Sequence, residues 1–327
     1  MTAKRLLVTG GSGFIGSAFI RSVLKKCEKI VNLDLLTYAS DPLRLKSVEN
    51  NSHYRYVQGD ICDQALIYDL CLSEQIDTIV HFAAESHVDR SIVDPKHFLT
   101  TNVVGTFALL EVVRKLSHIH FHHVSTDEVY GSLDKEGFFD EHSPYAPNSP
   151  YAASKAASDH FVRAYAKTYG LMTTISHSCN NYGPFQHPEK FIPLIISHCL
   201  QKKAVPIYGK GDQIRDWLYV DDHVEAIWMI LEKATKGAVY NIGAQTEMAN
   251  IDLVHLIMRQ LSTLTGEEYT SLISYVPDRP GHDYRYAVNA TKIKNELGWK
   301  PRQELQAALL KTILWTLDRS YNKEVSK

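Results

Sequence analysis

Residues 9–16 read TGGSGFIG, and this stretch joins a short apolar run, residues 4–9, to a run with helical periodicity, residues 14–26. A glycine-rich turn between a strand and a helix is typical of dinucleotide-binding folds. It lets the backbone approach a pyrophosphate, whose charge the helix N-terminus stabilises. Gly10, Gly13 and Gly16 carry this pattern. The stretch therefore predicts a cofactor site at the start of a parallel sheet.

The rest of the chain alternates β-rich and helical runs. Further buried strands are predicted at residues 29–34, 54–58, 78–82 and 121–125, and helices at 64–74, 102–116, 150–169, 222–233, 250–264 and 303–317. This alternation predicts a Rossmann-type doubly wound parallel α/β sheet. We expect a cofactor domain of residues 1–178 plus 213–245, and a smaller α/β substrate-binding domain of residues 179–212 plus 246–327.

Composition excludes several classes of protein. The 327 residues are 44% hydrophobic and 22% charged, which is ordinary for a globular chain. With Lys+Arg 35 against Asp+Glu 37, the chain has no basic field for nucleic acid. The five cysteines are scattered without a C-x-x-C pair, and no apolar run is long enough for a membrane span. We expect a cytoplasmic protein with no metal, nucleic-acid or membrane partner.

The choice of cofactor rests on Asp34, at the end of the second predicted strand. An acid at this place accepts hydrogen bonds from an adenosine ribose and repels a 2′-phosphate, so we expect NAD rather than NADP. Small or apolar residues at the ends of later strands let a cofactor approach the backbone. The cofactor residues predicted from these patterns are Gly10, Gly13, Phe14, Ile15, Gly16, Asp34, Asp60, Ile61, Phe82, Ala83 and Ala84.

Catalytic candidates occur in two places. Tyr151 and Lys155 stand one turn apart on a predicted helix, where an ammonium lowers the pKa of a phenol and holds a ribose hydroxyl. Thr126, Asp127 and Glu128 follow a buried strand, where two adjacent carboxyls can separate into a neutral acid and an ionised base. The alternative interpretations are an ordinary amphipathic helix and a turn with solvated acids.

Further motifs carry a family resemblance. AAESHVD at 83–89, STDEVYG at 125–131, YAASK at 151–155, NNYGP at 180–184 and DRPGHDYRY at 278–286 follow TGGSGFIG in order. Together they resemble the extended short-chain dehydrogenase/reductases, and within them the dTDP-glucose 4,6-dehydratase family. The resemblance adds Thr37, Ser86, Thr101, Tyr151 and Lys155 to the cofactor-binding residues.

The resemblance also implies a reaction and a substrate, dTDP-glucose, which loses water to give dTDP-4-keto-6-deoxyglucose. Tyr151, aided by Lys155 and Thr126, takes the 4-hydroxyl proton; Glu128 removes the proton on carbon 5; Asp127 protonates the departing 6-hydroxyl. A homodimer through residues 102–116 and 150–169 is implied as well. The implied substrate-binding residues are Ser86, Thr126, Asn180, Lys190, Phe191, Ile207, Tyr208, Arg215, Asn250, Asp278, Arg279, His282 and Tyr286.

Other functions stay open on the residues alone. The same scaffold serves nucleotide-sugar epimerases and decarboxylases, which do not need both Asp127 and Glu128. UDP-, CDP- or GDP-glucose could replace the thymidine nucleotide, and a non-catalytic NAD-binding protein is a third class. The chain departs from the family where His177 and Asn289 stand in place of the usual arginine and aspartate.

Overall fold

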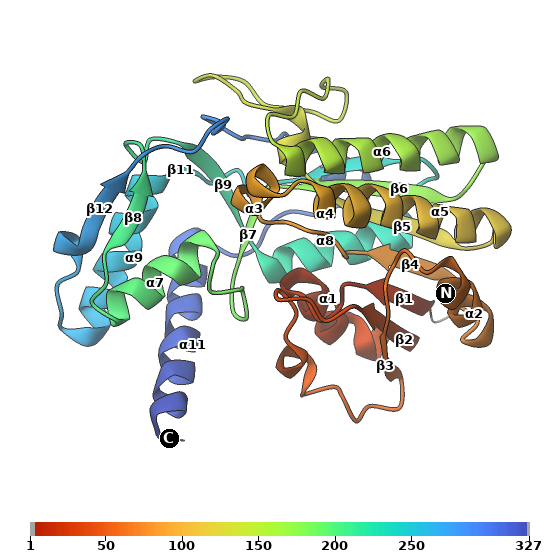
Figure 1. The fold of residues 1–327 in the computed structure, drawn as a ribbon, viewed down its shortest axis with the longest axis horizontal. Helices are drawn as coiled ribbons and strands as arrows, with labels where there is room; N and C mark the ends of the chain where they lie inside the picture. The colour runs from red at the N-terminus through yellow and green to blue at the C-terminus, as the bar shows by residue number, and fades with distance from the viewer. Residues whose placement is uncertain (1–3, 326–327) are drawn as a thin grey trace.

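The computed structural model describes residues 4–325, and its larger part is built on one parallel sheet. Seven strands lie in the order β10-β6-β5-β4-β1-β2-β3 (Figure 1). Their bounds are β1 (Lys4–Thr9), β2 (Cys27–Asp34), β3 (Tyr54–Gln58), β4 (Thr78–His81), β5 (His120–Thr126), β6 (Thr173–Ser178) and β10 (Val239–Ile242). Every pairing in this sheet is parallel, which confirms the predicted Rossmann-type fold.

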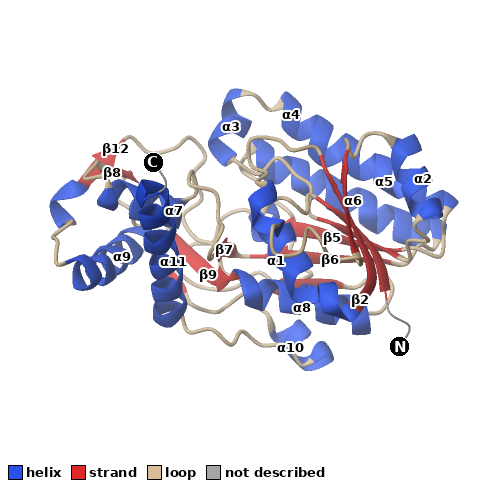
Figure 2. Ribbon diagram, turned by 90° about the horizontal axis from the view of Figure 1, so that it is seen from below, coloured by secondary structure: helices blue, strands red, loops and turns tan. Residues whose placement is uncertain are grey.

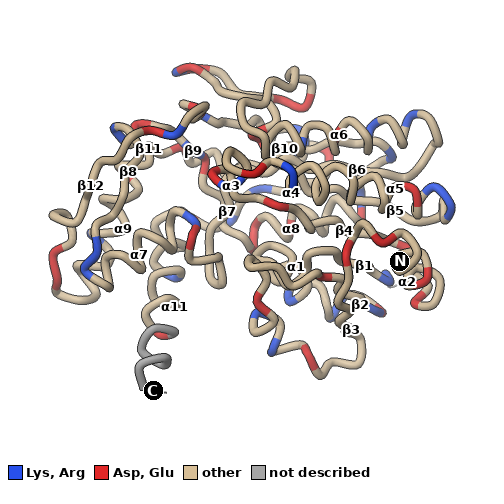
Figure 3. Tube along the Cα trace, viewed as in Figure 1, with Lys and Arg blue, Asp and Glu red and all other residues tan. Residues whose placement is uncertain are grey.

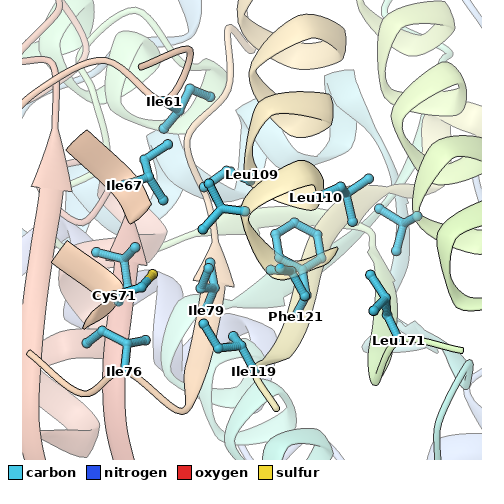
Figure 4. Packing of buried hydrophobic residues seen from close by; sticks show 14 of the residues in the cluster. Ile61, Ile67, Cys71, Ile76, Ile79, Leu109, Leu110, Ile119, Phe121 and Leu171 are labelled. Atoms are coloured by element: carbon cyan, nitrogen blue, oxygen red, sulfur yellow. The ribbon is translucent and has the colours of Figure 1, made fainter. Parts of the chain in front are cut away.

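Helices cover both faces of this sheet. They are α1 (Phe14–Val23) and α8 (Val220–Lys233) on one face, and α2 (Gln64–Ser73), α5 (Thr106–Lys115) and α6 (Pro150–Tyr169) on the other. Side chains alternate along β1, so Leu6 and Val8 pack with α1 and α8, whereas Leu7 packs with α2, α5 and α6. Figure 4 shows the second of these cores, where Leu109, Leu110 and Phe121 meet. We call this part of the molecule the cofactor half.

The smaller half has its own sheets and its own core (Figures 1 and 2). Its elements are β7 (Asn180–Tyr182), β8 (Val205–Tyr208), β9 (Ile214–Tyr219), β11 (Glu247–Ala249), β12 (Ile273–Val276), α7 (Phe191–Leu200), α9 (Asn250–Thr265) and α11 (Leu305–Val325). The strands form the sheets β11-β9-β7 and β12-β8. Residues 213–245 therefore pass between the halves, because β9 pairs with β7 and β11 whereas β10 joins the large sheet.

Short elements connect these parts. They are η1 (Leu24–Lys26), η2 (Pro42–Leu45), α3 (Val88–Val93), α4 (Lys96–Phe98), η3 (Leu99–Gly105), η4 (Asp127–Tyr130), η5 (Thr270–Leu272) and α10 (Thr291–Leu297). The helix predicted over 102–116 therefore begins earlier, as the π-helical η3, before it continues as α5.

Two predicted helix starts have different outcomes. The start of α6 is confirmed, since the Ser149 side chain accepts a hydrogen bond from the N–H of Ala152 and the helix stops at Gly170 in the left-handed region. The helix start predicted at residue 222 is wrong, because α8 already begins at Val220, directly after β9. The Asp222 carboxylate instead accepts the backbone N–H groups of Arg302 and Gln303.

Charges of both signs are interspersed along the trace (Figure 3). Among the described residues, none of the helices is long and apolar enough to cross a membrane.

Candidate active site

One cavity of about 520 Å³ lies at the carboxyl ends of β1, β2, β4, β5 and β6. Its wall includes residues 178–190, which lead into the smaller half, so both halves contribute to it. Ligands of open α/β sheets bind at this edge, and the volume is within the range of small-molecule sites.

The glycine-rich turn approaches neighbouring backbone too closely for a side chain. A Cβ on Gly10, whose φ is +70°, would lie 2.6 Å from the backbone nitrogen of Ala83, and a Cβ on Gly16 would meet the carbonyl oxygen of Gly10. The first turn of α1 carries no acidic residue, and its N–H groups have no acceptor inside the helix. Phe14 and Ile15, in this turn, line the cavity. The residues present therefore fit the pyrophosphate of NAD.

Asp34 holds the turn in place from the end of β2. Its carboxylate accepts hydrogen bonds from the N–H of Ser12 at 2.9 Å, the N–H of Leu36 at 2.9 Å and the hydroxyl of Ser40 at 2.7 Å. Asp34 also lines the cavity. That it binds the ribose of the cofactor stays a prediction, with which this position agrees.

The structure brings the predicted cofactor residues together. Lining the cavity are Gly10, Gly13, Phe14, Ile15, Gly16, Asp34, Thr37, Asp60, Ile61, Phe82, Ala83, Ala84, Ser86, Thr101, Tyr151 and Lys155.

The catalytic candidates meet at the same cavity from two elements. Thr126 ends β5, Asp127 and Glu128 begin η4, and Tyr151 and Lys155 come from the first two turns of α6. The Thr126 hydroxyl accepts the N–H of Glu128 at 3.3 Å and is hydrogen-bonded to Tyr151. The phenol of Tyr151, the carboxyl of Asp127 and the backbone N–H of Glu128 therefore surround one hydroxyl group.

The two adjacent carboxyls have different environments. Burial, the Glu128 charge and Asp216 raise the pKa of Asp127 well above its ordinary value. Burial also raises the pKa of Glu128, but Arg215 opposes this effect. One carboxyl oxygen of Asp127, Oδ2, is buried and has no hydrogen-bond partner among the described residues. Asp127 is thus suited to act as a neutral acid and Glu128 as the base.

Tyr151 differs from the sequence expectation. Burial first, and then the charge of Glu128, raise its pKa, while the hydrogen bond with Thr126 lowers it. The expectation that the neighbouring ammonium gives a net lowering is therefore wrong, because desolvation of a buried phenolate outweighs it. The Lys155 ammonium donates to the carbonyl of Val124 at 2.9 Å, and burial lowers its pKa to about 8.

The predicted substrate residues fall into two groups. Ser86, Thr126, Asn180 and Lys190 line the cavity, where the Lys190 ammonium donates to the Ser86 carbonyl at 2.9 Å. Outside its lining lie Phe191, Ile207, Tyr208, Arg215, Asn250, Asp278, Arg279, His282 and Tyr286.

The two arginines of this second group are already bound within the protein. The Arg215 guanidinium donates to the Asp283 carbonyl at 2.9 Å and lies 4.2 Å from the centre of the Tyr286 ring. Arg279 forms an ion pair with Asp89, with Nε 2.6 Å from Oδ1. To hold a diphosphate, Arg279 would have to exchange this carboxylate for phosphate oxygens.

Sequence reasoning missed the loop that follows NNYGP. Gln186, His187 and Glu189 line the cavity, and Glu189 pairs with Arg90 at 3.1 Å. Nothing in the spacing of these residues distinguishes them from an ordinary polar loop, because their role depends on contacts with residues far away in the sequence.

The chain is similar to known proteins over nearly its whole length. Residues 7–312 match the family model described as GDP-mannose 4,6 dehydratase. A probable dTDP-glucose 4,6-dehydratase of Sinorhizobium fredii is 48% identical, over 97% of this chain and 94% of that protein.

Two solved structures are similar over nearly the whole chain. The dTDP-glucose 4,6-dehydratase of Streptomyces venezuelae, with NAD bound, has a TM-score of 0.92 and 44% identity, covering 97% of this chain and 98% of the other. The enzyme of Bacillus anthracis, in complex with NAD, has a TM-score of 0.89 and 44% identity, covering 98% of each chain. The resemblance inferred from the motifs is confirmed, and the chain belongs to the dTDP-glucose 4,6-dehydratase family.

Proposed function

We propose that this protein is an NAD-dependent lyase that converts dTDP-glucose to dTDP-4-keto-6-deoxyglucose and water. The observation that carries the proposal is one cavity in which the glycine cradle meets a phenol, an ammonium and two carboxyls of unequal acidity. Family membership supports the same reaction.

The cofactor would be held by the glycine turn, by Asp34 at the ribose and by Lys155 at the second ribose. When bound, NAD supplies a reversible two-electron acceptor that oxidises carbon 4 and reduces carbon 6. The residues around it exclude water, since Tyr151 and Lys155 are almost fully buried.

The side chains move the protons of the reaction. Tyr151, as the phenolate that the Lys155 ammonium would stabilise, takes the 4-hydroxyl proton, with Thr126 as its hydrogen-bond partner, so that carbon 4 can become a ketone. The ketone acidifies the proton on carbon 5, and Glu128 removes it. Asp127 gives its proton to the 6-hydroxyl, which leaves as water. Glu128 returns its proton to carbon 5 when carbon 6 is reduced, and the proton that Tyr151 took replaces the one that Asp127 gave, so the atoms balance as the loss of one water.

The proposal also covers the domains, the assembly and the location of the protein. Residues 1–178 plus 213–245 would form the cofactor domain, and residues 179–212 plus 246–327 the nucleotide-sugar domain, with β9 as the part of 213–245 that pairs with strands of the smaller half. A homodimer would form through η3, α5 and α6, in the cytoplasm. Exposed aromatic side chains support this interface, because Phe107 on α5 and Phe161 on α6 form an edge-to-face pair on the surface.

The test is to incubate the purified protein with dTDP-glucose. We expect a product lighter by one water that carries a ketone, and deuterium placed on carbon 4 should reappear in the new methyl group. A sugar inverted at carbon 4, or loss of carbon dioxide from the matching uronic acid, would instead identify an epimerase or a decarboxylase. A panel of dTDP-, UDP-, CDP- and GDP-glucose tests the choice of nucleotide.

A further inference from the structure

A row of buried polar side chains, His123, Asp159 and His177, lies next to Lys155. The Lys155 Nζ is 3.2 Å from His123 Nε2, and the same His123 nitrogen is 3.3 Å from Asp159 Oδ1. The other carboxylate oxygen of Asp159 is 2.9 Å from His177 Nε2. The side chains of His123, Asp159 and His177 are completely buried. The proposed proton transfers use none of these three residues.

Asp159 carries the negative charge of this row of side chains. Its Oδ2 also accepts hydrogen bonds from the Ser125 hydroxyl at 3.0 Å and the Tyr145 hydroxyl at 3.1 Å. Hydrogen bonds to a charged carboxylate favour the ionised form, and the pKa of Asp159 is held well below its ordinary value although burial opposes this. A buried carboxylate therefore stands one helical turn beyond the Lys155 ammonium.

His177 holds the carboxylate of Asp159 from another side. Its Nε2 faces Asp159 Oδ2, so Nε2 donates, and the Tyr145 hydroxyl lies 2.9 Å from the same nitrogen. Its Nδ1 is 3.0 Å from the Tyr130 hydroxyl, which donates to Asn241 Oδ1 at 2.9 Å. The Asn241 amide is oriented by donating to the Phe139 carbonyl. His177 therefore shares the charge of Asp159 through a hydrogen bond.

The hydrogen bond from Lys155 makes His123 neutral. The Lys155 ammonium can only donate, so His123 Nε2 accepts from it and carries no proton of its own. The His123 proton then resides on Nδ1, which has no hydrogen-bond partner among the described residues. Asp159 Oδ1, which faces the bare Nε2, has none either, so Asp159 acts on Lys155 by its charge and not through a hydrogen bond. Burial lowers the pKa of His123 to about 4, which agrees with a neutral ring at ordinary pH.

We propose that Asp159 is a positioning residue for the reaction: its buried charge, one helical turn from Lys155 and across the His123 ring, keeps Lys155 an ammonium that donates to His123, and His177 shares that charge. The proposal deepens the proposed function, because Lys155 is the group that would hold the ribose beside Tyr151. The attraction to Asp159 opposes the burial that lowers the Lys155 pKa.

Other titratable side chains face this row of residues from each element packed against it. They are His81 on β4, His122 on β5, Tyr130 and Glu141 after β5, Tyr145 before α6, and Tyr151 and Arg163 on α6. The His81 ring lies 5.2 Å from the His123 ring, and burial lowers its pKa well below the ordinary value, so it adds no charge. Asp159 thus remains the carboxylate that acts on Lys155 most directly.

The expected pH dependence follows from the sign of each charge. Lys155 is an ammonium below its pKa of about 8, so activity should fall as the pH rises through that region. Asp159→Asn removes the attraction, and the alkaline limb of kcat should move down by about 1 pH unit. His177→Gln removes the imidazole that shares the charge of Asp159 and leaves the carboxylate, so the limb should move up. A purely structural role would lower kcat without moving the limb in opposite directions.

Asp222→Asn is the matched control, because Asp222 is also a buried carboxylate, yet it binds the backbone of residues 302–303 in a different region. It should reduce stability and leave the alkaline limb in place. If Asp159→Asn does not fold, the pH profile of kcat in His177→Gln tests the proposal by itself. An unmoved limb in both folded variants overturns the proposal.

A second readout needs no turnover, and so separates this proposal from the proposed reaction. Nitrogen-15 NMR of the histidine-labelled wild-type protein should show His123 protonated on Nδ1 and bare on Nε2. A proton on His123 Nε2 would contradict the proposed link to Lys155, whatever reaction the enzyme catalyses.

Discussion

Neighbouring residues in one turn can have opposite chemical roles when their surroundings differ. After burial, the charges of Glu128 and Asp216 are the largest influences on Asp127 and raise its pKa, although Arg215 opposes them. For Glu128 the largest charge effect is that of Arg215, which lowers its pKa. The sequence predicts the pair, and even the possibility that their pKa values separate. It cannot predict which one stays neutral, because Arg215 and Asp216 come from β9, far away in the sequence.

Glu128→Gln should stop the reaction after the first oxidation. The amide cannot remove the proton on carbon 5, so reduced cofactor should accumulate and overall turnover should fall by about 10²–10⁴-fold. Absorbance of the reduced cofactor after addition of dTDP-glucose measures this stall. Wild-type turnover in the variant would show that another group is the base.

Gly16→Ala should empty the cofactor site. The new Cβ would meet the Gly10 carbonyl oxygen and the Gly11 backbone, which are backbone atoms that cannot rotate away. We expect the purified variant to carry much less NAD than the wild type, measured by cofactor released on denaturation. Gly266→Ala is the control, because a Cβ there meets nothing within 4 Å although φ is +74°. Equal NAD content in Gly16→Ala and wild type would contradict the proposed cradle.

At the scale of helices and strands, the sequence around a helix end predicts that end only when the capping residue bonds within the same helix. Ser149, Pro150 and Gly170 lie at the ends of α6, and the Ser149 cap bonds to Ala152 of the same helix, so the sequence predicts both ends. Asp222 has the right spacing for a capping box, but the chain folds directly from β9 into α8, and its carboxylate binds residues 302–303 instead. A long-range partner has replaced the local one.

Ser149→Ala tests the cap of the helix that carries Tyr151 and Lys155. The N–H of Ala152 would lose its acceptor, so the free energy of unfolding should fall by about 1 kcal/mol. Urea denaturation followed by circular dichroism measures it, and Ser149→Asp, which keeps an acceptor oxygen, should recover most of the loss. A Ser149→Ala protein as stable as the wild type would mean that the cap contributes nothing to folding.

Across the whole molecule, the cofactor half is far more predictable than the smaller half. Its strands alternate with helices, its apolar runs are buried, and the glycine turn is contiguous, so short windows of sequence contain most of the information. The smaller half assembles from short strands separated by long stretches. The ion pair of Arg279 with Asp89 joins segments almost two hundred residues apart, and no periodicity predicts it.

The same kind of long-range contact closes the cofactor cavity. Glu189 lies on the loop that leads into the smaller half and pairs with Arg90 at 3.1 Å, while the Arg90 guanidinium lies 3.6 Å from the centre of the Tyr38 ring. Tyr38 follows β2, next to Thr37 at the cavity wall. These contacts lie beside Thr37 and Glu189 of the cavity lining, and we expect a cofactor that leaves the cavity to pass them.

Glu189→Gln should therefore speed cofactor release without changing the proton transfers. Arg90 is about half exposed, so solvent weakens the pair, and we expect release to be about two- to fivefold faster. Loss of bound NADH fluorescence after dilution into excess NAD measures the rate directly. Glu267→Gln removes an exposed ion pair with Lys202 on the smaller half, outside the cavity lining, and should leave the rate unchanged. Both substitutions remove one carboxylate charge, and only their places in the molecule differ. Equal release rates in the two variants would therefore show that other contacts hold the halves together at the rim.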